Sequence, residues 1–166
     1  DHNFDRPELM KSFGRFVQDL GGKYITAMDS GTQTSDMDAI SQTTKWVTCT
    51  SQTGDPSPYT ALGVFEGIKA SVKHLHGSDD LHGIHVSVQG LGHVGYAVAE
   101  LLYKSGAHLT VSDIDNAKVL KAVNELGAKA IAPDRIYGVE ADVFCPCGLG
   151  AIINDHSLQQ LHCRIV

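Results

Sequence analysis

The chain has 166 residues, 42% of them hydrophobic, which is enough for one globular domain or for one domain and part of another. Its formal net charge of −6 argues against nucleic acid as a partner, no apolar run could span a membrane, and residues 1–4 do not resemble a signal peptide. Four cysteines without C-x-x-C spacing indicate reduced thiols, so we expect a cytoplasmic protein. Nine histidines without a complete ligand cluster indicate no metal site.

Apolar periodicity predicts a helix near the start of the chain. Asp5 is a capping residue, Pro7 fits the first turn, and glycines at 21 and 22 end the pattern. The apolar residues at helical spacing are Leu9, Met10, Phe13, Phe16, Val17 and Leu20. This spacing is typical of an amphipathic helix.

Short segments and one long helix follow. The sequence predicts strands at residues 23–27 and 46–50 and a helix at residues 34–44. Residues 51–58 contain turn formers and two prolines, which marks a linker or a functional loop. The next segment predicts a long amphipathic helix that Gly77 ends. Its apolar stripe consists of Ala61, Val64, Phe65, Ile68, Val72 and Leu75.

Strands and helices alternate from residue 84 onward. The expected strands are 84–89, 107–113, 128–132, 141–147 and 163–166, and the expected helices are 94–103, 116–126 and a turn at 157–161. The inward side chains of the helix at 116–126 are Val119, Leu120, Val123 and Leu126. The alternation predicts the α/β class, with a parallel sheet and right-handed crossovers. Because a sheet that stops at Val166 lacks an outer layer, we expect a longer protein.

A glycine-rich turn joins the strand at 84–89 to the helix that follows. The motif G-x-G-x-x-G alone is weak, but here it has a strand before it and a helix after it. Gly90 permits the tight turn, Gly92 permits close approach of a pyrophosphate, and Gly95 permits close packing of helix and strand. The positions between these glycines are Leu91, His93 and Val94. The context predicts a dinucleotide-binding turn of the Rossmann type.

An acidic residue at the end of the next strand strengthens this prediction. Asp113, with Ile114 beside it, lies about twenty residues beyond Gly90, where a carboxylate binds the ribose hydroxyls. No arginine follows nearby to receive a 2′-phosphate, so NAD is favoured over NADP. The alternative is that Asp113 is only a helix cap or a turn residue.

Three further stretches carry a family resemblance. GGKYITAMDSGTQTSDMDAI at 21–40, GDPSPYTALGVFEGIKA at 54–70 and VEADVFCPCGLGAIIND at 139–155 resemble the amino acid dehydrogenases that act on glutamate, leucine, phenylalanine and valine. The resemblance covers essentially the whole chain. It implies that residues 1–54 end a substrate domain and that residues 55–166 form most of an NAD-binding Rossmann domain.

The resemblance also implies an activity and a set of site residues. The family deaminates an L-amino acid oxidatively and reversibly, using NAD and water, and the branch acting on branched-chain substrates, leucine above all, is the nearest in pattern. Asp29 matches the catalytic proton shuttle, and Ala27 matches a residue of the side-chain pocket. Thr60 matches the threonine that bonds the nicotinamide carboxamide, and Ser57, one helical turn before it, is assigned to the cofactor site as well. Turn formation for Asp29, packing for Ala27 and helix capping for Ser57 and Thr60 are the structural alternatives.

The end of the strand at 141–147 is assigned by the same resemblance. Cys145, Pro146 and Cys147 match backbone or packing contacts to NAD, at the strand end where open α/β sheets bind ligands. A redox pair is the alternative, although C-x-C spacing at a strand end is poor disulfide geometry.

The chain departs from the family pattern in several places. Met28 stands where branched-chain members usually carry an acid, and Ser30 replaces a usual apolar residue. The catalytic lysine of the family belongs to a glycine-rich segment upstream of residue 1, and no lysine present here has that context. We therefore expect an inactive fragment of an enzyme whose cleft lies between its domains and which forms a homo-oligomer. The rivals are a phenylalanine, valine or glutamate dehydrogenase, or a catalytically silent NAD-binding module.

Overall fold

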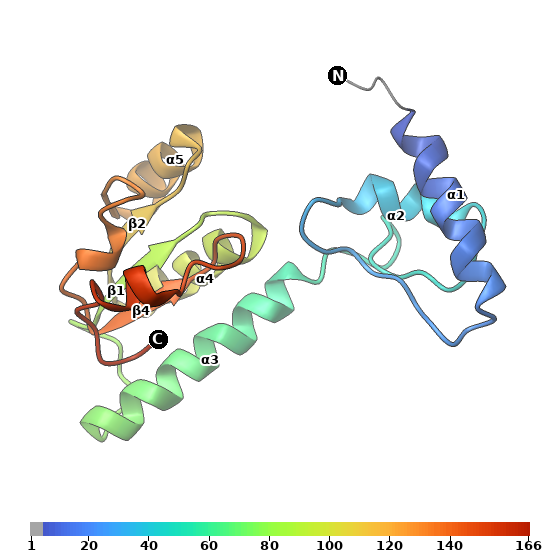
Figure 1. The fold of residues 1–166 in the computed structure, drawn as a ribbon. Coiled ribbons are helices and arrows are strands. Elements are labelled where there is room, and N and C mark those ends of the chain that lie inside the picture. The colour runs from blue at the N-terminus through green and yellow to red at the C-terminus, as the bar shows by residue number, and fades with distance from the viewer. Residues whose placement is uncertain (1–4) are drawn as a thin grey trace. The chain divides into compact units, whose positions relative to one another are not determined.

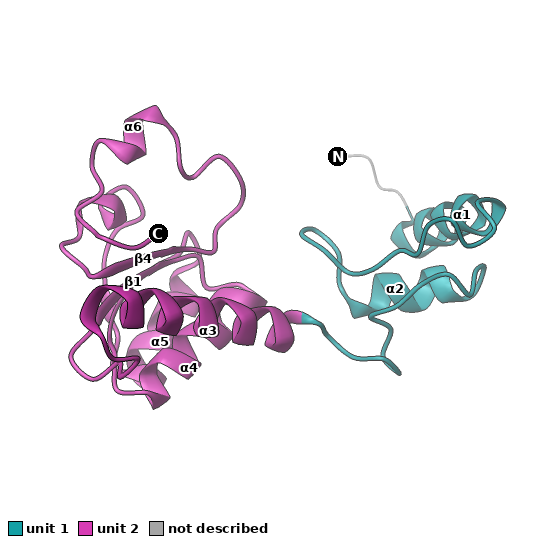
Figure 2. Cartoon of the chain, turned by 90° about the horizontal axis from the view of Figure 1, so that it is seen from below, with its two compact units in different colours: residues 1–56 teal, residues 57–166 magenta. Residues whose placement is uncertain are grey.

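The computed structural model describes residues 5–166 and divides the chain into two compact units, residues 1–56 and 57–166 (Figure 2). Residues 1–4, where the sequence gives no sign of a signal peptide, lie outside the described part. No helix within residues 5–166 is long and apolar enough to cross a membrane.

The first unit is built on two packed helices, α1 (Arg6–Asp19) and α2 (Thr34–Ser41). The Asp5 carboxylate caps α1 by accepting the Glu8 N–H at 3.2 Å, and Pro7 lies in the first turn, as the sequence predicts. A small core fills the space beside α2. Its members are Met37, Ile40 and Cys49, with Met10, Met28 and Val47 packed against them.

The two strands predicted for the first unit are wrong. Residues 23–27 and 46–50 form no strands, only an isolated parallel bridge between Thr26 and Val47, because two lone segments make a marginal sheet and Cys49 has a left-handed φ of 60°. Of the apolar residues of α1, Val17 is buried and Met10 packs against the small core, whereas Phe16 is 72% exposed.

The second unit contains a four-stranded parallel sheet in the order β3-β2-β1-β4 (Figure 1). Its elements are α3 (Ser57–His76), β1 (His85–Gln89), α4 (His93–Lys104), β2 (His108–Ser112), α5 (Asn116–Leu126), β3 (Lys129–Ala130), the 3-10 helix η1 (Ile136–Gly138), β4 (Val143–Pro146) and α6 (Asp155–Leu158). Beyond β1 the chain builds outward through β2 and β3, and then crosses back to place β4 on the other side of β1. The predicted α/β class with a Rossmann-type sheet is confirmed.

Helices α3, α4 and α5 lie on one side of this sheet, while α6 and the last segment lie on the other (Figure 2). The α3 stripe is buried as predicted, with Ala61 and Val72 fully enclosed. It packs with α4 against the apolar side chains of β1, β2 and β4. The prediction for Leu120 on α5 is wrong, because this side chain is 61% exposed while Ala122 faces the core instead.

The carboxyl-terminal part has less regular structure than the sequence predicts. Residues 163–166 form no strand, although Ile165 makes an isolated parallel bridge to Val143 and its carbonyl accepts the Phe144 N–H at 2.9 Å. The helical turn expected at 157–161 begins earlier, because the Asn154 side chain caps α6 and accepts the Ser157 N–H at 3.1 Å. Residues 163–166 therefore contribute a single isolated bridge beside β4.

Candidate functional site

The glycine turn lies where the carboxyl ends of β1 and β4 meet. Gly90 has a φ of +92°, in the left-handed region that side chains disfavour. A Cβ atom on Gly90 would lie 2.7 Å from the Cys147 carbonyl carbon and from the Gly148 nitrogen, both backbone atoms. Only glycine fits here, because the ends of β1 and β4 are in contact at the point where the strand order of the sheet reverses.

The other two glycines of the motif have opposite surroundings. A Cβ atom on Gly95 would overlap the Gly90 carbonyl oxygen, so α4 approaches the turn too closely for any side chain. A Cβ atom on Gly92 would meet nothing within 4 Å. Gly92 is also the N-cap of α4 and provides no side chain to cap it. The amino end of α4 therefore begins at a residue without a side chain, and the space that a side chain would fill is open.

Asp113 is bonded directly to this turn. Its Oδ2 atom accepts the Leu91 N–H at 2.5 Å, and its Oδ1 atom accepts the Asp115 N–H at 2.8 Å. The cap of α5 is Asp115, which accepts the Ala117 N–H at 2.9 Å. A carboxylate offers about four acceptor positions, so Asp113 keeps capacity for further donors beyond the two backbone groups.

The remaining residues predicted around the turn have distinct environments. Leu91 is buried, and Val94 is half-buried and packs against the core that α3 and α4 cover. His93 is exposed at the start of α4. Ile114 is 92% exposed directly after Asp113, which is unusual for a large aliphatic side chain. The turn thus combines a fixed backbone with an exposed apolar group beside the carboxylate.

The segment that ends β4 borders the same turn. The Cys147 N–H donates to the Gln89 carbonyl at 2.7 Å, which extends the β1–β4 pairing by one residue. Cys145 is buried, Pro146 is exposed and Cys147 is half-buried. The sulfur atoms of Cys145 and Cys147 lie 3.6 Å apart as free thiols.

Ser57 and Thr60 occupy the first turn of α3. Ser57 is buried and Thr60 is exposed. Helix α3 packs along α4, the helix that begins at the glycine turn. Both residues therefore belong to the same unit as the turn.

In the first unit, Asp29 lies in a tight turn. Its backbone carbonyl accepts the Thr32 N–H at 3.0 Å and the Thr32 hydroxyl at 2.7 Å, and its own carboxylate accepts the Ser30 N–H at 2.7 Å. Gly31 within the turn has a φ of +83°. Asp29 and Ala27 are both exposed. The turn holds the backbone of Asp29 in place and leaves its carboxylate accessible.

An ion pair that the sequence did not predict stabilises this turn. The Arg6 guanidinium donates to both oxygens of Asp36, at 2.7 and 2.9 Å, and to the Gly31 carbonyl at 2.7 Å. The Asp36 side chain is only 4% exposed, and its hydrogen bond to Arg6 holds the pKa of the carboxyl below its usual value. No local sequence signal connects two residues that are this far apart along the chain.

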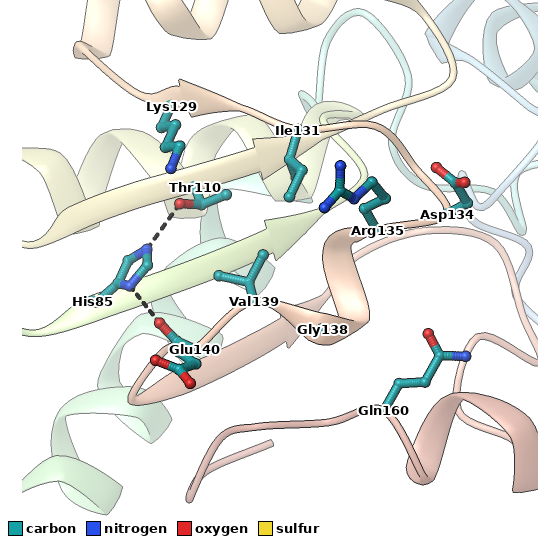
Figure 3. A pocket seen from close by; sticks show the side chains of 10 residues that line it. All are labelled: His85, Thr110, Lys129, Ile131, Asp134, Arg135, Gly138, Val139, Glu140 and Gln160. Carbon is teal, nitrogen blue, oxygen red and sulfur yellow. Dashed lines mark hydrogen bonds between the residues drawn. The ribbon is translucent and has the colours of Figure 1, made fainter.

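A separate cavity of about 490 Å³ opens on the sheet near the amino ends of β1 and β4 (Figure 3). The His85 ring lies beside it and is fixed between the Glu140 carbonyl, at 2.9 Å, and the Thr110 hydroxyl, at 2.8 Å. None of the residues that line this cavity is a predicted site residue. The glycine turn lies at the carboxyl ends of β1 and β4 instead.

The parallel sheet and the glycine turn identify the second unit as a Rossmann-type unit. Residues 55–121 match the family model for glutamate/leucine/phenylalanine/valine dehydrogenases. The whole chain is 49% identical to the leucine dehydrogenase of Geobacillus stearothermophilus and 47% identical to that of Thermoactinomyces intermedius, covering 47% of each. The chain therefore belongs to the glutamate/leucine/phenylalanine/valine dehydrogenase family.

A solved structure agrees with the sequence matches. The chain is similar to the crystal structure of L-tryptophan dehydrogenase from Nostoc punctiforme, with a TM-score of 0.75 and 38% identity over 99% of this chain and 47% of that one. The chain thus spans about half the length of the relatives it matches.

Proposed function

We propose that the protein carrying this chain is an NAD-dependent amino acid dehydrogenase that acts on branched-chain L-amino acids, with leucine preferred. The reaction converts the amino acid, NAD⁺ and water to the 2-oxo acid, ammonium, NADH and a proton. The observation that carries the proposal is the glycine turn between β1 and α4, with the Asp113 carboxylate bonded to it. The leucine preference follows the relatives of highest identity reported above.

The residues of the turn fit a dinucleotide. The open space at Gly92, the N-cap of α4 that supplies no side chain, suits a pyrophosphate at the amino end of the helix. The acceptor positions left on Asp113 suit the ribose hydroxyls, and the exposed Ile114 suits the face of an adenine ring. The negative charge of Asp113 disfavours a 2′-phosphate, which supports NAD over NADP.

The bound cofactor supplies the acceptor for the hydride that leaves Cα. Asp29 then exchanges protons with the amino nitrogen, a role that its exposed carboxylate on a braced turn permits. Ala27 would border the substrate side chain, where a small apolar residue suits an aliphatic group.

Further parts of the proposal concern the nicotinamide end and the whole protein. Ser57 and Thr60 would contact the nicotinamide, and Cys145, Pro146 and Cys147 would line the cofactor at the end of β4. Residues 1–54 would belong to the substrate domain and residues 55–166 to the NAD-binding domain. The whole protein would be a cytoplasmic homo-oligomer.

The test is NADH production by the full-length gene product with leucine, valine, isoleucine, phenylalanine and glutamate as substrates. We expect leucine to give the highest kcat/KM, and Asp29→Asn to lower kcat by about a hundredfold or more, as loss of a general base does. Asp38→Asn is the matched control, because Asp38 lies in the same unit and its carboxylate binds the Ser51 N–H. NAD binding with no turnover on any of these substrates would contradict the dehydrogenase and favour the silent module.

A further inference from the structure

Two thiols lie side by side where β4 ends. Cys145 is the third residue of β4 and Cys147 follows directly after the strand, so both side chains point to the same side of the sheet. Their sulfur atoms are 3.6 Å apart. Cys145 is 5% exposed, whereas Cys147 is accessible in part. The two thiols differ in access but share one site.

The pair has an electronic asymmetry as well. The hydrogen bond to Cys145 lowers the pKa of the Cys147 thiol, because it stabilises the thiolate. The same hydrogen bond, together with burial, raises the pKa of Cys145. Cys147 is therefore the more nucleophilic and the more accessible sulfur, and Cys145 is a second thiol held within reach.

The distance between the sulfurs fits a bridging atom better than a direct bond. A disulfide requires a separation of about 2.05 Å, much shorter than the 3.6 Å found here. Two bonds of about 2.3 Å from one central atom, meeting at roughly 100 to 110°, place two sulfurs about 3.5 to 3.8 Å apart. Within the described residues no further histidine, cysteine or acid completes a metal site around them. The pair thus suits a thiophilic atom that needs only two protein bonds.

We propose that Cys145 and Cys147 form a dithiol site for a trivalent, thiophilic electrophile of the organoarsenical class, at the end of β4 beside the glycine turn. The Cys147 thiolate attacks the arsenic of an aryl arsenoxide first, and the Cys145 thiol follows. Two S–As bonds form, the As–O bonds break, and the oxygen leaves as water with the two thiol protons. No atom in the protein is oxidised or reduced.

The two thiols lie beside the glycine turn. A Cβ atom on Gly95 would lie 2.9 Å from the Cβ of Cys147, and the Cys147 backbone contacts Gly90. A ligand on the two sulfurs would therefore adjoin the turn. We expect NAD and the arsenical to exclude one another, an expectation that rests on the proposed dinucleotide site.

The other two cysteines provide controls. Cys49 is buried in the core of the first unit, and the pKa of Cys163 is raised by burial. Within residues 5–166 the sulfurs that lie side by side are those of Cys145 and Cys147, so Cys49 and Cys163 each offer a single bond. A variant with Cys49→Ala and Cys163→Ser retains the pair and should bind as the unaltered chain does.

The test is titration of the chain with phenylarsine oxide, followed by intact mass spectrometry and by counting free thiols. We expect one adduct, formed with loss of one water and of two free thiols. Cys147→Ser and Cys145→Ala should each weaken the adduct by about a hundredfold, because the second bond is intramolecular. Alanine is used at position 145 because a buried hydroxyl would need a partner, and thermal unfolding verifies that both variants fold.

Unweakened binding by either variant, or an adduct on Cys49 or Cys163, would overturn the dithiol site. Saturating NAD should slow adduct formation at least about tenfold. Binding of NAD without any protection would overturn the placement beside the turn. A chain that does not bind NAD at all contradicts the proposed function, while the cysteine variants still decide the dithiol site.

Discussion

The Asp113 carboxylate accepts the Leu91 N–H at 2.5 Å, and this bond ties the end of β2 to the glycine turn that follows β1. The turn is also held by contact between Gly90 and the Cys147 backbone. Three strands of the sheet thus fix one short loop. A loop fixed in this way needs little reordering when a ligand binds to it.

The first prediction concerns Asp113→Asn. The amide can accept only with one oxygen, so it loses the charge and one of the two hydrogen bonds. We expect affinity for NAD to fall by about ten- to hundredfold, the range for a charged hydrogen bond, and the preference against NADP to shrink. Calorimetric titration with both cofactors measures this. Asp115→Asn is the control, since asparagine caps a helix as well as aspartate does. An equal loss of NAD affinity in this variant would show that the effect comes from the overall negative charge and not from the hydrogen bonds of Asp113.

The second prediction separates fold from function within the motif. Gly95→Ala places a methyl group against the Gly90 carbonyl oxygen, and we expect a loss of about 3 kcal/mol from the free energy of unfolding. Gly63→Ala is the matched helical control, because α3 leaves open space there, and it should stabilise the chain by about 0.5 to 1 kcal/mol. Denaturant unfolding of both variants measures the contrast, and similar stabilities would refute the close approach of α4 to the turn.

The third prediction concerns Gly92→Ala. Because a methyl group at this position meets no protein atom, the free energy of unfolding should change by no more than about 1 kcal/mol, the cost of alanine at an N-cap. A pyrophosphate lying there would collide with it, so affinity for NAD should fall at least about tenfold. Unchanged affinity in a folded variant would place the phosphates elsewhere.

The fourth prediction concerns the pH dependence of the first unit. Arg6 lowers the pKa of Asp36 in the folded chain, so the pair adds stability above the ordinary pKa of 3.8 and loses it as the pH falls through the lowered value. In Arg6→Gln the folded pKa is no longer depressed, and the acid transition should move to higher pH. Fluorescence of Trp46, the single tryptophan, reports on this unit alone. Identical acid midpoints for the two chains would show that Arg6 and Asp36 do not stabilise this unit.

The second unit could be predicted well from the sequence because its local signals agree. The strand before Gly90, the helix after it and the acid at 113 each indicate the same arrangement, and the ends of α5 were predicted to the residue. The burial of Leu120 was misjudged because a wide apolar face does not show which edge meets the sheet.

The first unit was less predictable because its structure depends on contacts between distant residues. The segments at 23–27 and 46–50 have β-propensity but form a single bridge, since no third segment among residues 5–56 pairs with them. The Arg6–Asp36 pair that braces the Asp29 turn has no periodic or local signal. The assignment of Asp29 therefore rested on family resemblance, and its role remains a proposal.

The most direct measurement uses the full-length gene product with leucine deuterated at Cα and mass spectrometry of the reduced cofactor. A dehydrogenase that moves the hydride from Cα to the nicotinamide should yield NADH carrying one deuterium, with none released to water, and Asp29→Asn should slow its formation. Unlabelled NADH, or no reduction of NAD by a protein that binds it, would contradict the account.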